Sequence, residues 1–109
     1  MSKSTIWIHY DFGVLGDYES FYQWLDKQEA KECGDGLALL KYEYSGNLIE
    51  SLKSELDGSI IVTKKTRMYV IYRDQQSQKM KGVFIFGGRK TPVWSGFFRK
   101  NEEDLIDYE

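Results

Sequence analysis

The sequence predicts a small α+β domain in which two helices pack on one face of a mostly antiparallel sheet. Its length of 109 residues suits a single domain. The residues are 41% hydrophobic and 16% aromatic, so large rings can build one core. Turn and capping signals divide the chain into the order β-α-β-α-β-β, for which placing both helices on one face is the economical packing. We therefore expect one domain over residues 1–100 and an acidic tail over residues 101–109.

The first two expected elements are a strand and a helix. Residues 5–12 are β-branched and aromatic without a breaker, which is typical of a buried strand. Gly13 and Gly16 then open a loop. Asp17 is a good N-cap and apolar residues follow it at helical spacing, so we expect a helix that runs to about Ala30.

A second strand and a second helix follow a glycine break at residues 34–36. Residues 37–44 alternate between an apolar face and a mixed face, which indicates a strand. Asn47 precedes Glu50 by three residues, the spacing of a capping box at the start of a helix. We expect this helix to end at Asp57-Gly58.

The last expected elements form a hairpin. Residues 67–73 are apolar on both faces, which favours a central strand. The polar residues 74–79 turn the chain, and residues 80–86 provide the partner strand. A further short strand is expected at residues 59–63 or at residues 93–98.

Charge is sharply segregated along the chain. Residues 1–58 contain five Lys and Arg against eleven Asp and Glu, a net charge of −6. Residues 59–100 contain ten Lys and Arg against Asp74 alone, a net charge of +9, and residues 101–109 add five carboxylates. Segregation of this kind bears on partners and on the electric field rather than on the fold.

The cysteine count and the distribution of apolar residues bear on the cellular compartment. Cys33 is the single cysteine, so no disulfide can form within the chain. No apolar stretch follows the amino terminus as in a signal peptide, and no apolar run approaches the ~18 residues of a membrane span. We expect a cytoplasmic protein with no membrane partner.

The basic segment also contains seven aromatic rings. Cations neutralise phosphates and exposed rings stack on bases, which is how many proteins hold single strands, so the pattern predicts a site for RNA or single-stranded DNA. The residues expected to form it are Lys64, Lys65, Arg67, Arg73, Lys81, Arg89, Lys90, Trp94 and Arg99. In the alternative interpretation the rings belong to the core and the cations are solvated on the outer sheet face. The acidic tail either screens the basic face or serves solubility.

Asp11 is the candidate catalytic and metal-binding residue, because it ends the first strand just before a glycine loop and lies near Asp17 and Glu19. One or two protein carboxylates plus water and phosphate suffice to hold Mg²⁺. His9 lies on the same strand face and is a candidate base. In the alternative interpretation Asp11 caps the loop, Asp17 caps the helix and His9 is packed; no cofactor is then expected.

Two further features bear on chemistry. Cys33 follows the expected helix end, a position that does not favour a reactive thiolate. Gly87-Gly88 precedes Arg89 and Lys90, but the following residues do not continue the Walker phosphate-loop pattern. The backbone amides there could bind a phosphate or a carboxylate, or the segment is a turn with solvated charges.

A resemblance adds to these patterns. It rests on the strand at residues 7–11, the helix entry at residues 16–18, the strand at residues 39–42, the second helix over residues 47–56 and the strand at residues 67–72. In these parts the chain resembles the small CRISPR-associated adaptation nuclease superfamily, which includes virulence-associated toxin relatives.

The resemblance implies a ferredoxin-like sandwich and a homodimer. It also implies that Asp11 faces its twin across the dimer and holds a metal ion that cleaves phosphodiesters. Some members of the superfamily act only as dimeric scaffolds. The sequence departs from the family pattern in two places, because residues 37–44 replace a hairpin between the helices and residues 74–100 have no counterpart.

Three hypotheses for function follow. The leading one is a non-enzymatic, dimeric nucleic-acid-associated protein of bacterial or phage type that binds RNA or single-stranded DNA through residues 64–100. The second is a metal-dependent phosphodiesterase or endoribonuclease centred on Asp11. The third is a protein-interaction module or inhibitor that pairs an edge strand around residues 93–98 with a partner protein.

Overall fold

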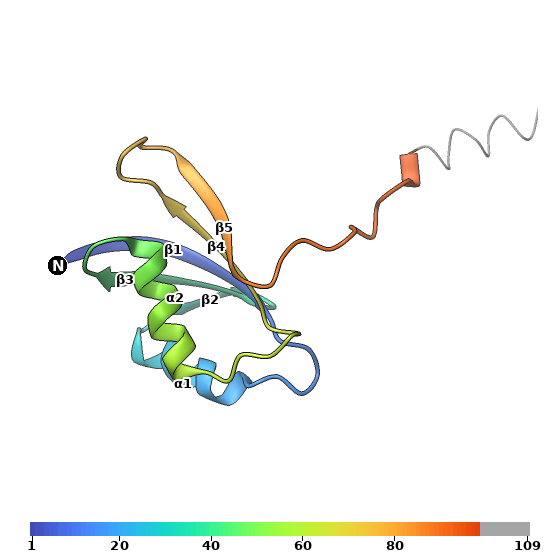
Figure 1. The fold of residues 1–109 in the computed structure, drawn as a ribbon, viewed down its shortest axis with the longest axis horizontal. Helices are drawn as coiled ribbons and strands as arrows, with labels where there is room; N and C mark the ends of the chain where they lie inside the picture. Colours follow the sequence, from blue (N-terminus) through green and yellow to red (C-terminus); the bar gives the residue numbers. More distant parts are fainter. Residues whose placement is uncertain (99–109) are drawn as a thin grey trace, which may run out of the picture.

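The computed structural model describes residues 1–98; Arg99 and the expected tail at residues 101–109 lie outside the described residues. Figure 1 shows the resulting fold. Its elements are β1 (Ser2–Asp11), α1 (Tyr18–Lys27), β2 (Lys31–Gly34), β3 (Leu37–Tyr44), α2 (Leu48–Ser59), β4 (Arg67–Arg73) and β5 (Met80–Phe86). The expected α+β class is confirmed, with one strand more than the sequence predicts.

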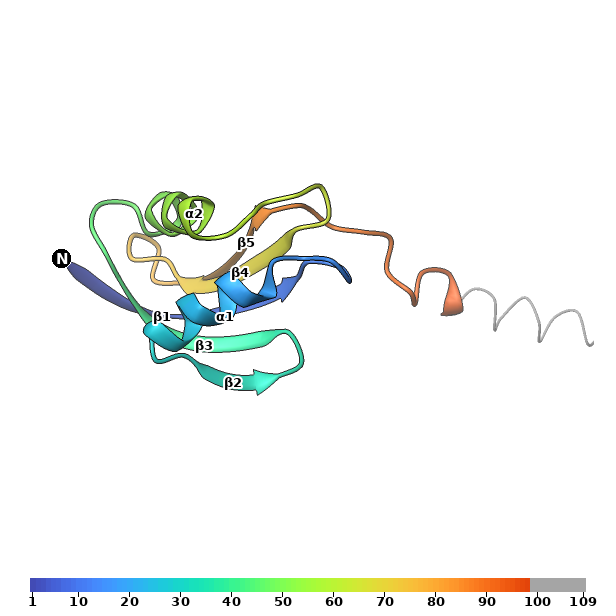
Figure 2. The same ribbon diagram turned by 90° about the horizontal axis from the view of Figure 1, so that it is seen from below.

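The five strands form one antiparallel sheet in the order β2-β3-β1-β4-β5. β1 is central and pairs along its length with β3 and β4. The first four strands have the order of a ferredoxin-like sandwich, and β5 adds an edge beside β4. Both helices lie on the same side of this sheet (Figures 1 and 2). The predicted sandwich is therefore confirmed.

The core lies between the sheet and the two helices. Every second residue of the central strands points into it, and the side chains of Ile6, Ile8 and Val70 are fully buried. They meet a helical layer that contains Phe21 of α1 and Leu52 of α2. Burying each such side chain contributes roughly 1.5–3 kcal/mol, so this layer stabilises the packing of the helices on the sheet.

Both helices begin at the residues that the sequence predicts. The Asp17 carboxylate accepts a hydrogen bond from the backbone N–H of Ser20 at 3.2 Å, and the Asn47 side chain accepts one from Glu50 at 2.9 Å. These caps satisfy backbone donors that the first helical turn leaves free. Asp17 also accepts from the backbone N–H of Ile61 at 2.9 Å, which ties the start of α1 to the segment after α2.

β2 is the strand that sequence patterns do not reveal. α1 ends at Lys27, earlier than predicted, and Glu29 takes a positive φ of 57° that reverses the chain. The strand over Lys31–Gly34 then pairs with β3, with a register shift between Glu32 and Gly34. Three of its four residues are exposed, so they lack the apolar alternation that marks a strand. The structure thus supplies a hairpin between the helices, and Cys33 lies exposed on an edge strand rather than at a helix end.

Neither expected additional strand forms. α2 continues past Gly58 to Ser59, and the following residues 60–63 are irregular. Residues 93–98 form turns and the beginning of a helical turn instead of a strand. The backbone N–H of Ser95 donates to the carbonyl of Pro92 at 3.0 Å, as expected where proline and glycine favour tight turns.

The chain leaves the sheet after β5, and we call residues 87–98 the arm. Both views show this segment running away from the body of the molecule (Figures 1 and 2). The large apolar side chains near its end are exposed. The arm therefore contributes little to the core of the described residues.

Candidate functional site

The sheet has one side that the helices do not cover, and we call it the open face. The strand register places its side chains in rows across the sheet. Across β3, β1, β4 and β5 the first row is Leu39, Trp7, Ile71 and Gly82, with Lys31 of β2 beside Leu39 at the edge of the sheet. The second row is Leu37, His9, Tyr69 and Phe84, and the third is Asp11 and Arg67. The open face therefore changes from apolar in the first row to aromatic in the second and charged in the third.

Four side chains on and beside the second and third rows form what we call the arginine stack: Arg67, Tyr69, Phe84 and Arg89. The rings of Tyr69 and Phe84 meet edge to face with their centroids 4.7 Å apart. The Cζ atom of Arg89 lies 5.7 Å from both ring centroids. The Cζ atom of Arg67 lies 5.6 Å from the Phe84 centroid. Both guanidinium groups thus lie within cation–π distance of one ring.

The backbone at the base of the arm fixes this stack. Arg67 donates from Nε to the carbonyl oxygen of Gly88 at 3.1 Å. Gly87 has a φ of 72°, and an added Cβ would lie 2.8 Å from the carbonyl oxygen of Thr66. Glycine is therefore required there, because other residues disfavour this conformation and have no room. The glycine pair serves to bring Arg89 back over the rings.

The predicted nucleic-acid-binding residues separate into two groups at opposite ends of the β4–β5 hairpin. The group beside the base of the arm is Lys64, Lys65, Arg67, Arg89 and Lys90, and the group at the hairpin turn is Arg73 and Lys81. Trp94 lies exposed in the arm. One predicted cluster thus includes the two arginines of the arginine stack, and the other lies at the opposite end of the hairpin.

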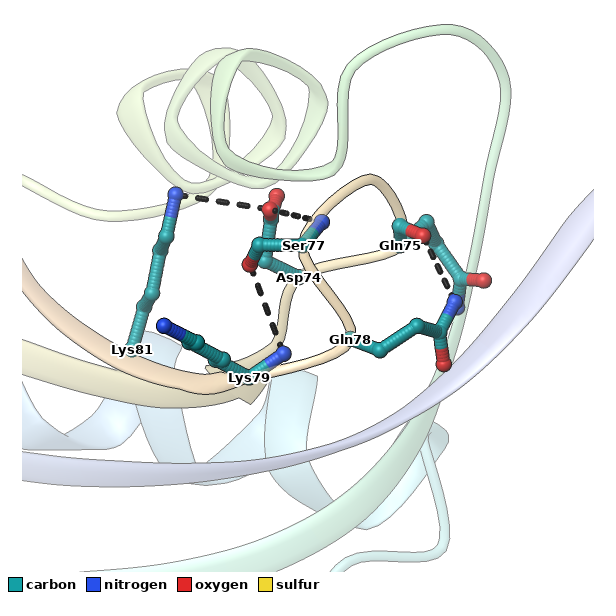
Figure 3. Close-up of polar contacts among 6 residues, drawn as sticks. All are labelled: Asp74, Gln75, Ser77, Gln78, Lys79 and Lys81. Carbon is teal, nitrogen blue, oxygen red and sulfur yellow. Dashed lines mark hydrogen bonds and ion pairs between the residues drawn. The ribbon is translucent and has the colours of Figure 1, made fainter.

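An aspartate partly neutralises the cluster at the hairpin turn (Figure 3). The Asp74 carboxylate accepts from the backbone N–H of Ser77 at 2.9 Å and lies 3.3 Å from Nζ of Lys81. The Ser77 backbone bond, followed by its side chain and Lys81, lowers the pKa of Asp74. The carboxylate therefore stays charged at neutral pH and competes with any phosphate for Lys81.

Asp11 is the last residue of β1, and its hydrogen bond to the following loop indicates a structural role. Its Oδ1 atom accepts from the backbone N–H of Gly13 at 3.0 Å, so the carboxylate caps the loop. The Asp17 carboxylate caps the start of α1 instead of forming a shared site with Asp11. Within residues 1–98, no three His, Cys, Asp or Glu side chains lie close enough together to hold a metal ion. The magnesium site at Asp11 therefore stays a prediction that rests on one carboxylate.

An open hollow of about 500 Å³ lies beside Asp11. Besides Asp11 itself, its lining includes His9, Tyr10, Tyr18, Tyr22, Glu32 and Asp35. Burial, followed by a hydrogen bond with Tyr22, raises the pKa of Tyr10 to about 12. The Tyr10 hydroxyl is therefore protonated at neutral pH, so in this hollow it can serve as a hydrogen-bonding group but not as a base.

Tyr69 and Phe84 are the members of the arginine stack that the predicted binding residues omit. The sequence does contain a signal for them. A turn over residues 74–79 places Arg73 opposite Met80, and the same register then places Tyr69 opposite Phe84. The positions of Arg67 and Arg89 over these rings depend on the path of the chain after β5, which the hairpin register alone does not determine.

Comparison of the chain with protein-family models, with curated proteins and with solved structures found no match. Neither helix of the described residues is long and apolar enough to cross a membrane. The function must therefore be argued from the open face and the groups that line it.

Proposed function

We propose that the protein binds RNA or single-stranded DNA at the arginine stack and the three lysines beside it. The observation that carries this proposal is the pair of guanidinium groups that share the Phe84 ring on a sheet face the helices do not cover. Lys64, Lys65 and Lys90 are exposed at the same end of the hairpin. Positive charge therefore lies beside the flat aromatic rings and guanidinium groups at this end of the hairpin.

The chemistry of the stack suits phosphates and bases. A guanidinium group that lies on a ring keeps its N–H edges free to form paired hydrogen bonds with a phosphate. Unstacked bases of a single strand also stack on aromatic rings and on guanidinium planes. Within residues 1–98, no carboxylate lies within ion-pair distance of Arg67 or Arg89. Both groups therefore retain charge for an incoming phosphate.

Substitution of the two arginines tests the proposal. Arg67→Gln and Arg89→Gln should each weaken binding of a labelled single-stranded oligonucleotide by about tenfold. This corresponds to about 1.4 kcal/mol, the loss of one charge-assisted contact. Lys27→Gln in α1 and Lys53→Gln in α2 change the net charge equally but lie on the helical side. Fluorescence anisotropy at one fixed salt concentration measures all four variants.

The controls define what contradicts the proposal. The helical-side variants should bind within about twofold of the unsubstituted protein, because distant surface charges are largely screened. Equal losses in all four variants would show that only net charge matters, and no binding by the unsubstituted protein would also exclude the site. Far-UV circular dichroism should show that every variant keeps its fold.

The nuclease hypothesis and the family resemblance behind it stay predictions. Asp11→Asn should abolish Mg²⁺-dependent cleavage of RNA or DNA while leaving the binding of the oligonucleotide intact. Unchanged cleavage by this variant would remove the assignment to Asp11.

A further inference from the structure

Within the part of the chain that the structure describes, the arm ends in a cluster of exposed apolar side chains. Val93, Trp94, Phe97 and Phe98 are 86, 72, 59 and 76% exposed. Four large apolar side chains within six residues expose a contiguous surface, which in a folded protein marks an interaction site. The bond from Phe97 N–H to the Trp94 carbonyl at 3.1 Å gives this segment a defined turn before it meets a partner.

The open face offers an apolar surface of matching character. Its first row contains Leu39, Trp7 and Ile71 on three adjacent strands. Ile71 is 37% exposed. The row ends at Gly82 on β5 and at Lys31 on β2, which pairs with Leu39, and the three side chains between these ends are apolar. Leu39, Trp7 and Ile71 therefore form an apolar strip across β3, β1 and β4.

The base of the arm directs the apolar cluster away from its own sheet. The bond from Arg67 to the Gly88 carbonyl and the contacts of Arg89 with both rings hold the first residues of the arm. The left-handed backbone at Gly87 sets the same direction. Both ribbon views show the arm extended into solvent (Figures 1 and 2).

We propose that the arm of one copy docks on the first row of the open face of a second copy. Reciprocal docking of two arms then forms a dimer with two-fold symmetry, the commonest arrangement of identical chains. Trp94 and Phe97 provide the anchoring rings, and Trp7 and Ile71 provide the surface that receives them. The proposal is independent of nucleic-acid binding, which uses the second and third rows and the base of the arm.

Sedimentation of the full chain across a concentration series tests the dimer. The unsubstituted protein should reach a mass close to twice 12.8 kDa. Trp94→Ser combined with Phe97→Ser should shift the monomer–dimer midpoint to at least tenfold higher concentration, and Ile71→Lys should do the same from the receiving side. Val14→Ser combined with Leu15→Ser is the matched control, because these loop residues are 95 and 97% exposed. The control variant should dimerise as the unsubstituted protein does.

A cross-link distinguishes exchange between copies from folding back within one copy. In a Cys33→Ser background, one preparation carries Trp94→Cys and the other carries Ile71→Cys. Oxidation of the mixture should give a disulfide-linked pair that contains one chain of each kind.

Several results would overturn the proposal. They are a mass of one chain at every concentration, a dimer that the arm variants leave unchanged, and a control variant that weakens the dimer as strongly as they do. A disulfide that forms within one chain carrying both cysteines, with no linked pair from the mixture, would also overturn it. Circular dichroism of each variant should match the unsubstituted protein, which excludes unfolding as the cause of a lost dimer.

Discussion

Gly82 lies under the ring of Tyr69, where the first and second rows of the open face meet. An added Cβ would overlap the Tyr69 hydroxyl and the ring carbons beside it. Tyr69 can therefore cover β5 and contact Phe84 only because its neighbour has no side chain. The shape of the arginine stack thus depends on a residue that carries no functional group.

Replacement of Gly82 with Ala should displace the Tyr69 ring from the stack. We expect the free energy of unfolding to fall by roughly 1–2 kcal/mol, as for other added groups in packed sites. Gly58→Ala is the matched control, because Gly58 lies in α2 with open space around it. The control should gain about 0.5–1 kcal/mol from its better helix propensity. Urea titration measures both variants, and a Gly82→Ala variant as stable as the unsubstituted protein would contradict this packing.

Asp17 gives the fold a defined response to acid. The backbone N–H of Ile61, followed by that of Ser20, lowers the pKa of this carboxylate in the folded protein. The unfolded chain has a higher pKa, about 3.9, and binds the proton first. The stabilisation is therefore fully present above about pH 4 and is lost as the pH falls through the lower pKa of the folded state.

Asp17→Asn should remove this part of the pH dependence. The free energies of unfolding of the variant and the unsubstituted protein should differ most at neutral pH and converge below pH 3.9, the approximate unfolded pKa. Denaturant titrations at several pH values measure both curves. A constant difference at every pH would show that the charge of Asp17 is not what stabilises the helix start.

At the scale of elements, one carboxylate joins both helices to the sheet. Glu55 of α2 accepts from the indole N–H of Trp24 in α1 at 2.7 Å and from the hydroxyl of Tyr42 in β3 at 3.3 Å. Burial is the main cause that raises the pKa of Tyr42, so its hydroxyl remains a donor at neutral pH. Three elements that are distant in the sequence therefore meet at one polar group.

Glu55→Ala should lower the free energy of unfolding by about 1–2 kcal/mol, because the indole N–H of Trp24 loses its acceptor and Tyr42 keeps only the Ser51 hydroxyl as a partner. Ser54→Ala is the control, since it removes an exposed side chain from the same helix without touching this network. Thermal or urea unfolding gives the comparison. Equal stability of the two variants would show that water replaces Glu55 without cost.

Much of the element order follows from local sequence. The strands β3, β4 and β5 have the bounds that the sequence predicts, and Asp17 and Asn47 cap the helices as predicted. These features depend on neighbours in sequence. β2 could not be predicted in this way, because its exposed residues become a strand only through pairing with β3 and through the early end of α1.

The candidate site was predictable in its residue types but not in its arrangement. Charge counting identifies Arg67 and Arg89 as parts of a basic segment. Their meeting over Phe84 depends on the turn at Gly87, a tertiary feature that composition does not reveal. The loop-capping role of Asp11 depends on neighbours in sequence and could be predicted. The hollow beside it could not, because residues from β2 and α1 line it as well.

At the scale of the whole molecule, the two sides of the sheet have different roles. The helical side contains the core, the first row of the open face is the surface proposed for a second copy, and the base of the arm concentrates five cations. The basic segment is therefore not one uniform surface, because the hairpin turn lies at the opposite end and holds Asp74 against Lys81. The proposed function depends on the cluster around the arginine stack.

The salt dependence of single-strand binding tests this account most directly. Each phosphate contact on a single strand contributes about −0.7 to the slope of log K against log salt concentration. Two to five contacts from the cluster therefore predict a slope between about −1.4 and −3.5, to be measured with labelled RNA and DNA between about 50 and 200 mM salt. Arg67→Gln should reduce the magnitude of that slope by about 0.7. Binding that does not change with salt, or no binding at the lowest salt concentration, would contradict the account.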